Sequence, residues 1–128
     1  MLPTGSPLLW WDGFPLGFAL TCVIELPAYL AGFAALGWLR PTGRLRVPAV
    51  LALGLAVNLV THPALWFVAH RLDGVAALGS AEIGVVVVEG LLMAVVTRRP
   101  ALSLLLALAV NALSTGIGLV ALPLLIGR

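Results

Sequence analysis

Residues 101–126, ALSLLLALAVNALSTGIGLVALPLLI, carry no charged side chain over a length sufficient to cross a lipid bilayer. A hydrocarbon core about 30 Å thick requires about 20 predominantly apolar residues of α-helix. Three further stretches meet this description, at residues 14–39, 47–69 and 81–97, of which the last is the shortest. The sequence therefore predicts four transmembrane helices.

The composition of the whole chain agrees with a membrane protein. Hydrophobic residues make up 62% of the 128 residues, and charged residues only 9%. A soluble domain carries about 25% charged residues, and far fewer would not cover a water-exposed surface. We predict an all-α membrane protein in which residues 1–128 form one four-helix transmembrane bundle, with the lipid bilayer as its solvent.

The arginines predict the orientation of this bundle and argue against nucleic acid as a partner. The basic residues lie in the connections between apolar stretches rather than on one face of a folded domain, as a nucleic-acid-binding protein requires. Two connections, residues 40–46 and 98–100, hold most of them, whereas the other side has Arg71 and Arg128. By the positive-inside rule these two connections are cytoplasmic and both termini lie on the outer side. The expected location is a bacterial inner membrane.

Tryptophan and phenylalanine near the predicted membrane boundaries support the same assignment. Trp10, Trp11, Trp66 and Phe67 fall near the outer interface, and Trp38 falls near the inner one. Such aromatic belts are typical of membrane–water interfaces.

Three glutamates lie inside the predicted spans, where an ionisable group is costly and is a candidate functional residue. Glu25 lies near the middle of the first span, two residues before Pro27, and Glu89 lies in the middle of the third. Glu82 is seven residues before Glu89 and shares its helical face, closer to the outer end. The sequence places no arginine at the depth of these carboxyl groups.

The second and fourth spans add polar side chains in a similar pattern. Asn58 and His62 share one helical face, with Thr61 beside it, and Asn111 and Ser114 lie together on the fourth span. Each asparagine is followed three residues later by a hydroxyl, which is consistent with a loose parallel repeat of two helices. Asparagine, serine and threonine also join membrane helices by hydrogen bonds, so a structural role is an alternative.

With a rise of about 1.5 Å per residue, these polar groups fall at similar depths in the middle-to-outer layer of the membrane. Independent helix-packing residues need not coincide in depth, so the pattern favours one shared site. The predicted cation or proton site consists of Glu25, Asn58, Thr61, His62, Glu89, Asn111 and Ser114, with Glu82 at its access.

Four interpretations of this site are open. Handling of a proton or small cation is favoured and implies a homo-oligomer, because four helices are few for a transporter. A second is a divalent-metal site of Glu25, His62 and Glu89, to which Cys22 adds a thiolate; no other cofactor is expected. A third is an intramembrane enzyme, which the lack of a nucleophile motif disfavours. The fourth is a structural or assembly subunit among other membrane subunits.

Overall fold

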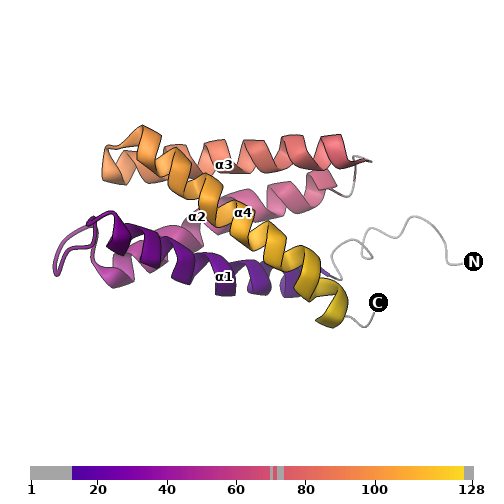
Figure 1. Cartoon of the computed structure of the whole chain (residues 1–128), viewed down its shortest axis with the longest axis horizontal. Coiled ribbons are helices and arrows are strands. Elements are labelled where there is room, and N and C mark those ends of the chain that lie inside the picture. The colour runs from indigo at the N-terminus through magenta and orange to yellow at the C-terminus, as the bar shows by residue number, and fades with distance from the viewer. Residues whose placement is uncertain (1–12, 70, 72–73, 126–128) are drawn as a thin grey trace, which may run out of the picture.

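The computed structural model describes residues 13–69, 71 and 74–125, and these fold into four long helices (Figure 1). The helices are α1 (Phe14–Ala35), α2 (Val47–Ala69), α3 (Val75–Thr97) and α4 (Pro100–Leu125). Each is long and apolar enough to cross a membrane. The chain is therefore an all-α, multi-pass membrane protein, and the predicted fold class is confirmed.

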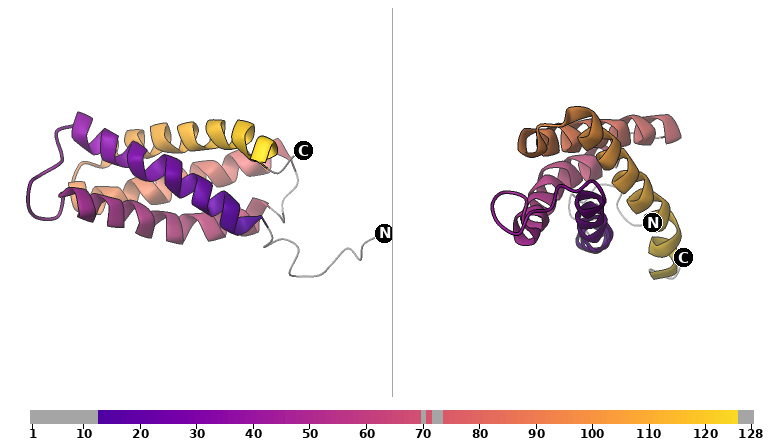
Figure 2. Two further views of the ribbon diagram at one scale, coloured as in Figure 1. Left: turned by 90° about the horizontal axis from the view of Figure 1, so that it is seen from below. Right: turned by 60° about the vertical axis from the view of Figure 1, so that its left-hand side comes forward.

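The four helices form a ring in which each one packs against two neighbours. Contacts join α1 to α2, α2 to α3, α3 to α4, and α4 back to α1. Helix α1 therefore lies opposite α3, and α2 lies opposite α4. The turns α1–α2 and α3–α4 lie at one end of the bundle, here called the turn end; α1 begins and α4 ends at the other, the open end (Figures 1 and 2). Which end faces the cytoplasm remains a prediction.

Helix α1 ends at Ala35, four residues before the predicted boundary, because a glycine stops it. Gly37 has a φ of 66°, a left-handed conformation that is accessible to glycine. Its N–H donates to the carbonyl of Ala34, and the N–H of Trp38 donates to the carbonyl of Phe33. These two hydrogen bonds form a Schellman motif, which satisfies the last carbonyls of the helix and turns the chain back toward the bundle.

Helix α3 begins at Val75, six residues before the predicted start at residue 81. Ser80, which directly precedes the predicted start, lies inside the helix, and its hydroxyl donates to the carbonyl of Ala76. A serine can bond to the preceding turn in this way instead of capping a helix. The longer α3 matches α2 in length. The predicted end of the fourth span at Ile126 lies outside the described residues, as do Trp10 and Trp11.

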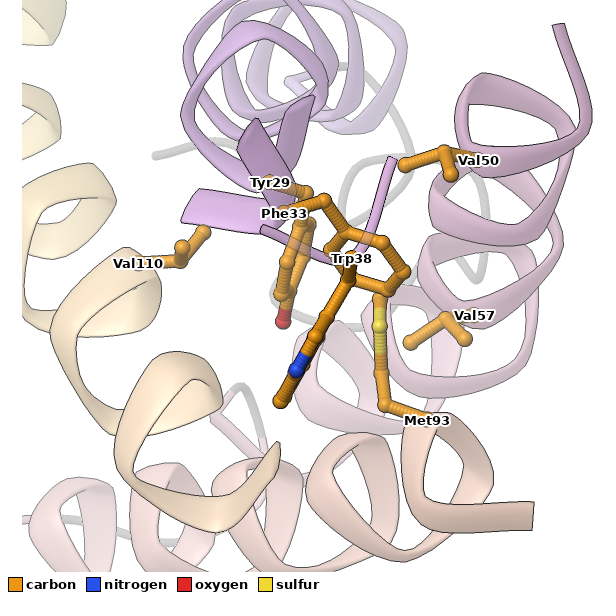
Figure 3. Close-up of a cluster of buried hydrophobic side chains, with 7 residues drawn as sticks. All are labelled: Tyr29, Phe33, Trp38, Val50, Val57, Met93 and Val110. Atoms are coloured by element: carbon orange, nitrogen blue, oxygen red, sulfur yellow. The ribbon is translucent and has the colours of Figure 1, made fainter. Parts of the chain in front are cut away.

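Apolar side chains fill the half of the bundle nearest the turn end (Figure 3). We call this cluster the apolar plug; it consists of Tyr29, Phe33, Trp38, Val50, Val57, Met93 and Val110. The Trp38 ring packs edge-on against Phe33, with ring centroids 5.2 Å apart, and only 7% of the residue is exposed. Trp38 therefore covers the core, whereas the sequence led us to expect it in an aromatic belt. The polar groups in the middle of the bundle are separated from the turn end by this plug.

The contact between α3 and α4 yields a test of the packing. A Cβ atom added to Gly90 would lie 2.9 Å from the Cα of Leu104, whereas one added to Gly84 on the same helix meets nothing within 4 Å. We expect Gly90→Ala to destabilise the protein by about 1–3 kcal/mol through overpacking. We expect Gly84→Ala to leave stability unchanged or to raise it by about 0.5–1 kcal/mol. Thermal unfolding in detergent measures both, and equal effects would contradict the observed packing.

Candidate functional site

A pocket of about 330 Å³, with largely apolar walls and several polar side chains, occupies the other half of the bundle, between all four helices. We call it the vestibule. Its mouth lies at the open end, where Gly17, Ala69, Leu78 and Leu119 line it. Its polar lining consists of Thr21, Glu25, Asn58, His62, Glu82, Glu89, Asn111, Ser114 and Thr115. All predicted site residues except Thr61 therefore share one pocket, and Glu82 lies on its wall as the predicted access residue.

Glu89 lies at the inner end of the vestibule and is bonded to all three other helices. Its Oε2 accepts hydrogen bonds from the hydroxyl of Tyr29 on α1 and from the Nδ2 of Asn111 on α4, each at 2.6 Å. Its Oε1 lies 2.8 Å from the hydroxyl of Thr61 on α2. Only 1% of Glu89 is exposed. This carboxyl group is thus the junction at which the four helices meet.

Tyr29 belongs to this junction although the sequence analysis did not include it in the site. It follows Glu25 by four residues, which is one helical turn, and so it lies on the same side of α1. This spacing from Glu25 is the feature of the sequence that could have identified Tyr29 as a site residue. Tyr29 was missed because tyrosine is also a common core residue, and Tyr29 does belong to the apolar plug as well.

The hydrogens of this junction are all accounted for when Glu89 is a neutral acid. The Thr61 hydroxyl has one hydrogen, yet its oxygen lies 3.0 Å from the carbonyl oxygen of Val57 as well as 2.8 Å from Glu89 Oε1. A backbone carbonyl only accepts. Both contacts are hydrogen bonds at once if Oε1 carries a proton and donates to Thr61, which donates to Val57. Asn111 likewise uses its two amide hydrogens, one on Glu89 and one on the carbonyl of Ala107.

Glu25 is as deeply buried as Glu89 but has fewer partners. Only 2% of it is exposed, and its Oε2 has no hydrogen-bond partner among the residues that the structure describes. Asn58 and Ser114 lie beside its carboxyl group. The Nδ2 of Asn58 donates to the carbonyl of Gly54, so part of the donor capacity near Glu25 is already used. Glu25 is therefore the carboxyl group of the vestibule that remains available to bind something else.

The expected two-helix repeat describes which polar side chains lie at each carboxyl group. In the α1–α2 hairpin, Asn58 lies beside Glu25, and in the α3–α4 hairpin, Asn111 donates to Glu89. The two hydroxyls, Thr61 and Ser114, lie in each case at the glutamate of the opposite hairpin. The two hairpins thus exchange polar partners in a pseudo-twofold manner.

The outer part of the vestibule holds His62 and Glu82. The Nε2 of His62 lies 3.4 Å from the Thr21 hydroxyl, and its ring lies between those of Phe14 and Phe18, with centroids 6.1 and 5.7 Å away. Glu82 lies beside Thr115 on α4. These groups make the approach to Glu25 polar. Gly17 at the mouth precedes Glu25 by eight residues, so the vestibule is about 12 Å deep along α1 at about 1.5 Å per residue.

The predicted divalent-metal set of Glu25, His62 and Glu89 is not assembled. Within residues 13–69, 71 and 74–125, no group of three or more histidine, cysteine, aspartate or glutamate side chains is placed to hold a metal ion, and Cys22 does not complete one. The reason is visible in the hydrogen bonds. Both oxygens of Glu89 are hydrogen-bonded to side chains of the other helices, and the His62 Nε2 lies next to Thr21.

Neither a protein-family model, nor a curated protein, nor a solved structure matches this chain. No function is therefore transferred from a relative, and the vestibule with its two buried carboxyl groups is the feature that bears on function.

The junction at Glu89 predicts a contrast between two substitutions. We expect Glu89→Gln to retain most of the stability, because glutamine reproduces the acceptor and donor pattern of the neutral acid. We expect Glu89→Ala to lower the free energy of unfolding by about 2 kcal/mol or more, because it leaves the Tyr29 hydroxyl and an Asn111 amide hydrogen buried without an acceptor. Unfolding in mixed micelles measures both. Equal losses in the two variants would show that the hydrogen-bond pattern does not hold the helices together.

The one-sided vestibule predicts one-sided chemical access. In a background in which Cys22 is replaced by serine, we expect Thr115→Cys to react with a membrane-impermeant thiol reagent added to the open-end side. Ala107→Cys, on the same helix but fully buried toward the turn end, is expected to stay unreactive from both sides. Labelling of Ala107→Cys from the turn end would show that the apolar plug does not close the bundle.

Proposed function

We propose that this protein binds and handles a proton or a small cation at Glu25, in the middle of the membrane, and that the ligand reaches this group through the vestibule. The observation that carries the proposal is the buried Glu25 carboxyl group, whose Oε2 has no partner among the described residues. An ionisable group in a membrane span faces a functional cavity or pairs with an opposite charge. No arginine of the part of the chain that the structure describes lines the vestibule, so a proton or an external cation is the partner that charge balance favours.

The sign of the charges in the vestibule supports a positively charged ligand. Within residues 13–69, 71 and 74–125, the ionisable residues of its lining are Glu25, Glu82, Glu89 and His62. Two or more carboxyl groups without a basic partner either hold protons or attract cations. An anion entering the same space would meet acidic groups along its path, so the vestibule disfavours anionic ligands.

The apolar plug supports binding from one side rather than passage through an open channel. Tyr29, Phe33 and Met93, which belong to the plug, are fully buried between the vestibule and the turn end. A hydrated ion cannot cross such a layer without losing its water, which costs several kcal/mol or more. Transport by this protein therefore requires a rearrangement of the plug, and the conformation described here is the one open at the open end only.

Location and oligomeric state form part of the proposal. The arginine distribution favours a bacterial inner membrane with both termini outside. All four helices of one chain build the vestibule. We therefore propose that each chain carries a complete binding site, and that further copies in a homo-oligomer pack outside it.

A structural or assembly role is the second candidate, and the Glu89 junction favours it. This carboxyl group is fully engaged by three helices, which is what a packing residue requires. The same reasoning does not extend to Glu25. A purely structural protein would tolerate a neutral side chain of the same shape at Glu25, whereas proton or cation handling would not.

The test is flux in liposomes that contain the purified protein and a trapped pH-sensitive dye. With a pH or Na⁺ gradient imposed, we expect the wild type to change the internal pH. We expect Glu25→Gln to fall to the rate of protein-free liposomes, because an amide neither takes up a proton nor attracts a cation.

A matched pair of serine substitutions on α4 serves as the control. Ser114→Ala removes a hydroxyl beside Glu25 and should slow the flux, whereas Ser103→Ala removes a buried hydroxyl outside the vestibule and should not. Wild-type flux in a folded Glu25→Gln protein would refute the proposed function and leave the assembly role.

A further inference from the structure

We infer that the ligand of the vestibule is a small amphipathic organic cation: an amine or ammonium group bound against Glu25, carried on a compact apolar body. This inference rests on the proposed function, since it names the class of cation. It depends on three properties of the site, namely the unpartnered oxygen of Glu25, the apolar character and size of the walls, and the shortage of hydrogen-bond donors at the inner end.

The unpartnered oxygen arises where the pseudo-twofold pattern breaks. Tyr29 follows Glu25 by four residues on α1 and donates to Glu89 on the opposite helix. The residue that follows Glu89 by the same interval on α3 is Met93, and a thioether has no hydrogen to donate. Glu89 therefore receives a tyrosine hydroxyl that has no counterpart at Glu25, where Ser114 and Asn58 are the neighbouring polar groups. A buried carboxyl oxygen without a donor is costly, and a ligand that supplies one is bound favourably.

The walls of the vestibule fit an apolar body better than an inorganic ion. Above the carboxyl groups they include Leu20, Ile24, Leu65, Val85 and Leu119. Hard metal cations take about six or more oxygen ligands, which such walls do not supply. The volume of about 330 Å³ lies in the range of about 300–1,000 Å³ that is usual for small organic ligands. A water molecule, by comparison, takes about 30 Å³.

The inner end of the vestibule favours a ligand that donates hydrogen bonds, because most of its own donors already have acceptors. Tyr29 donates to Glu89, and Asn111 donates to Glu89 and to a backbone carbonyl. Asn58 donates one of its amide hydrogens to the carbonyl of Gly54. What remains without a donor at this end of the vestibule is the buried Oε2 of Glu25, with the Ser114 hydroxyl beside the carboxyl group. An ammonium group carries donors and the complementary charge together, so it satisfies this end of the pocket.

The experiment is isothermal titration of the purified protein in lipid nanodiscs with three probes, corrected against empty nanodiscs. The probes are phenethylammonium, its neutral counterpart 2-phenylethanol, and Na⁺. We expect phenethylammonium to bind the wild type and to bind Glu25→Gln about tenfold more weakly or worse, since a hydrogen bond to a charged group is lost. We expect 2-phenylethanol to bind at least about tenfold more weakly than the amine. Ser103→Ala, outside the vestibule, should bind the amine as the wild type does.

A second variant tests where the apolar body is bound. Gly118 lines the vestibule, and a Cβ added to it meets nothing within 4 Å, so Gly118→Leu fills the space proposed for the apolar body without removing Glu25. We expect this variant to bind phenethylammonium about tenfold more weakly than the wild type or worse.

The outcomes divide clearly. Flux that depends on Glu25 without binding of phenethylammonium overturns the organic-cation inference and leaves the proposed function standing. Amine binding that is unchanged in both Glu25→Gln and Gly118→Leu also overturns it, because the amine then binds elsewhere. A wild type that shows neither flux nor amine binding refutes the proposed function together with the inference.

Discussion

The carboxyl group of Glu89 is the interaction on which the rest of the structure depends. Helices surrounded by lipid gain little from the hydrophobic effect on packing together, so their association relies on close packing and on hydrogen bonds. Here one side chain on α3 collects partners from α1, α2 and α4: Tyr29, Thr61 and Asn111. This junction fixes the depth at which the four helices cross. It also divides the bundle into a polar half on one side and the apolar plug on the other.

Much of this arrangement was predictable from the sequence because lipid constrains a chain more strictly than water does. Four apolar stretches can only be four helices, and polar residues at the same depth can lie together only inside the bundle. The grouping of Glu25, Asn58, His62 and Glu89 in one pocket follows from these constraints and agrees with the structure. Helix spacing and depth were sufficient to predict which of these residues share a pocket, while their role in binding stays a prediction.

The sequence could not show how these residues pair across helices, and there the structure adds most. Whether an oxygen receives a donor depends on helix rotation and crossing, which spacing along one helix does not reveal. Tyr29 was therefore missed as a donor, and Trp38 was expected at an interface although the Schellman motif after Ala35 folds it over the core. The same limit applies to the metal hypothesis, since the three residues share a pocket but point to different partners.

Two glutamates of equal burial thus have different consequences because their surroundings supply different numbers of donors. At Glu89, side chains from three helices complete the hydrogen bonds, and the carboxyl group becomes part of the scaffold. At Glu25, the corresponding place in the pattern is taken by Met93, which contributes volume to the plug and no hydrogen. The rigid junction therefore supports a second carboxyl group that its own fold leaves incomplete. A buried acceptor held in this way at the end of an acidic, half-apolar vestibule is preorganised for a cationic ligand, because the bundle has already met the cost of ordering it.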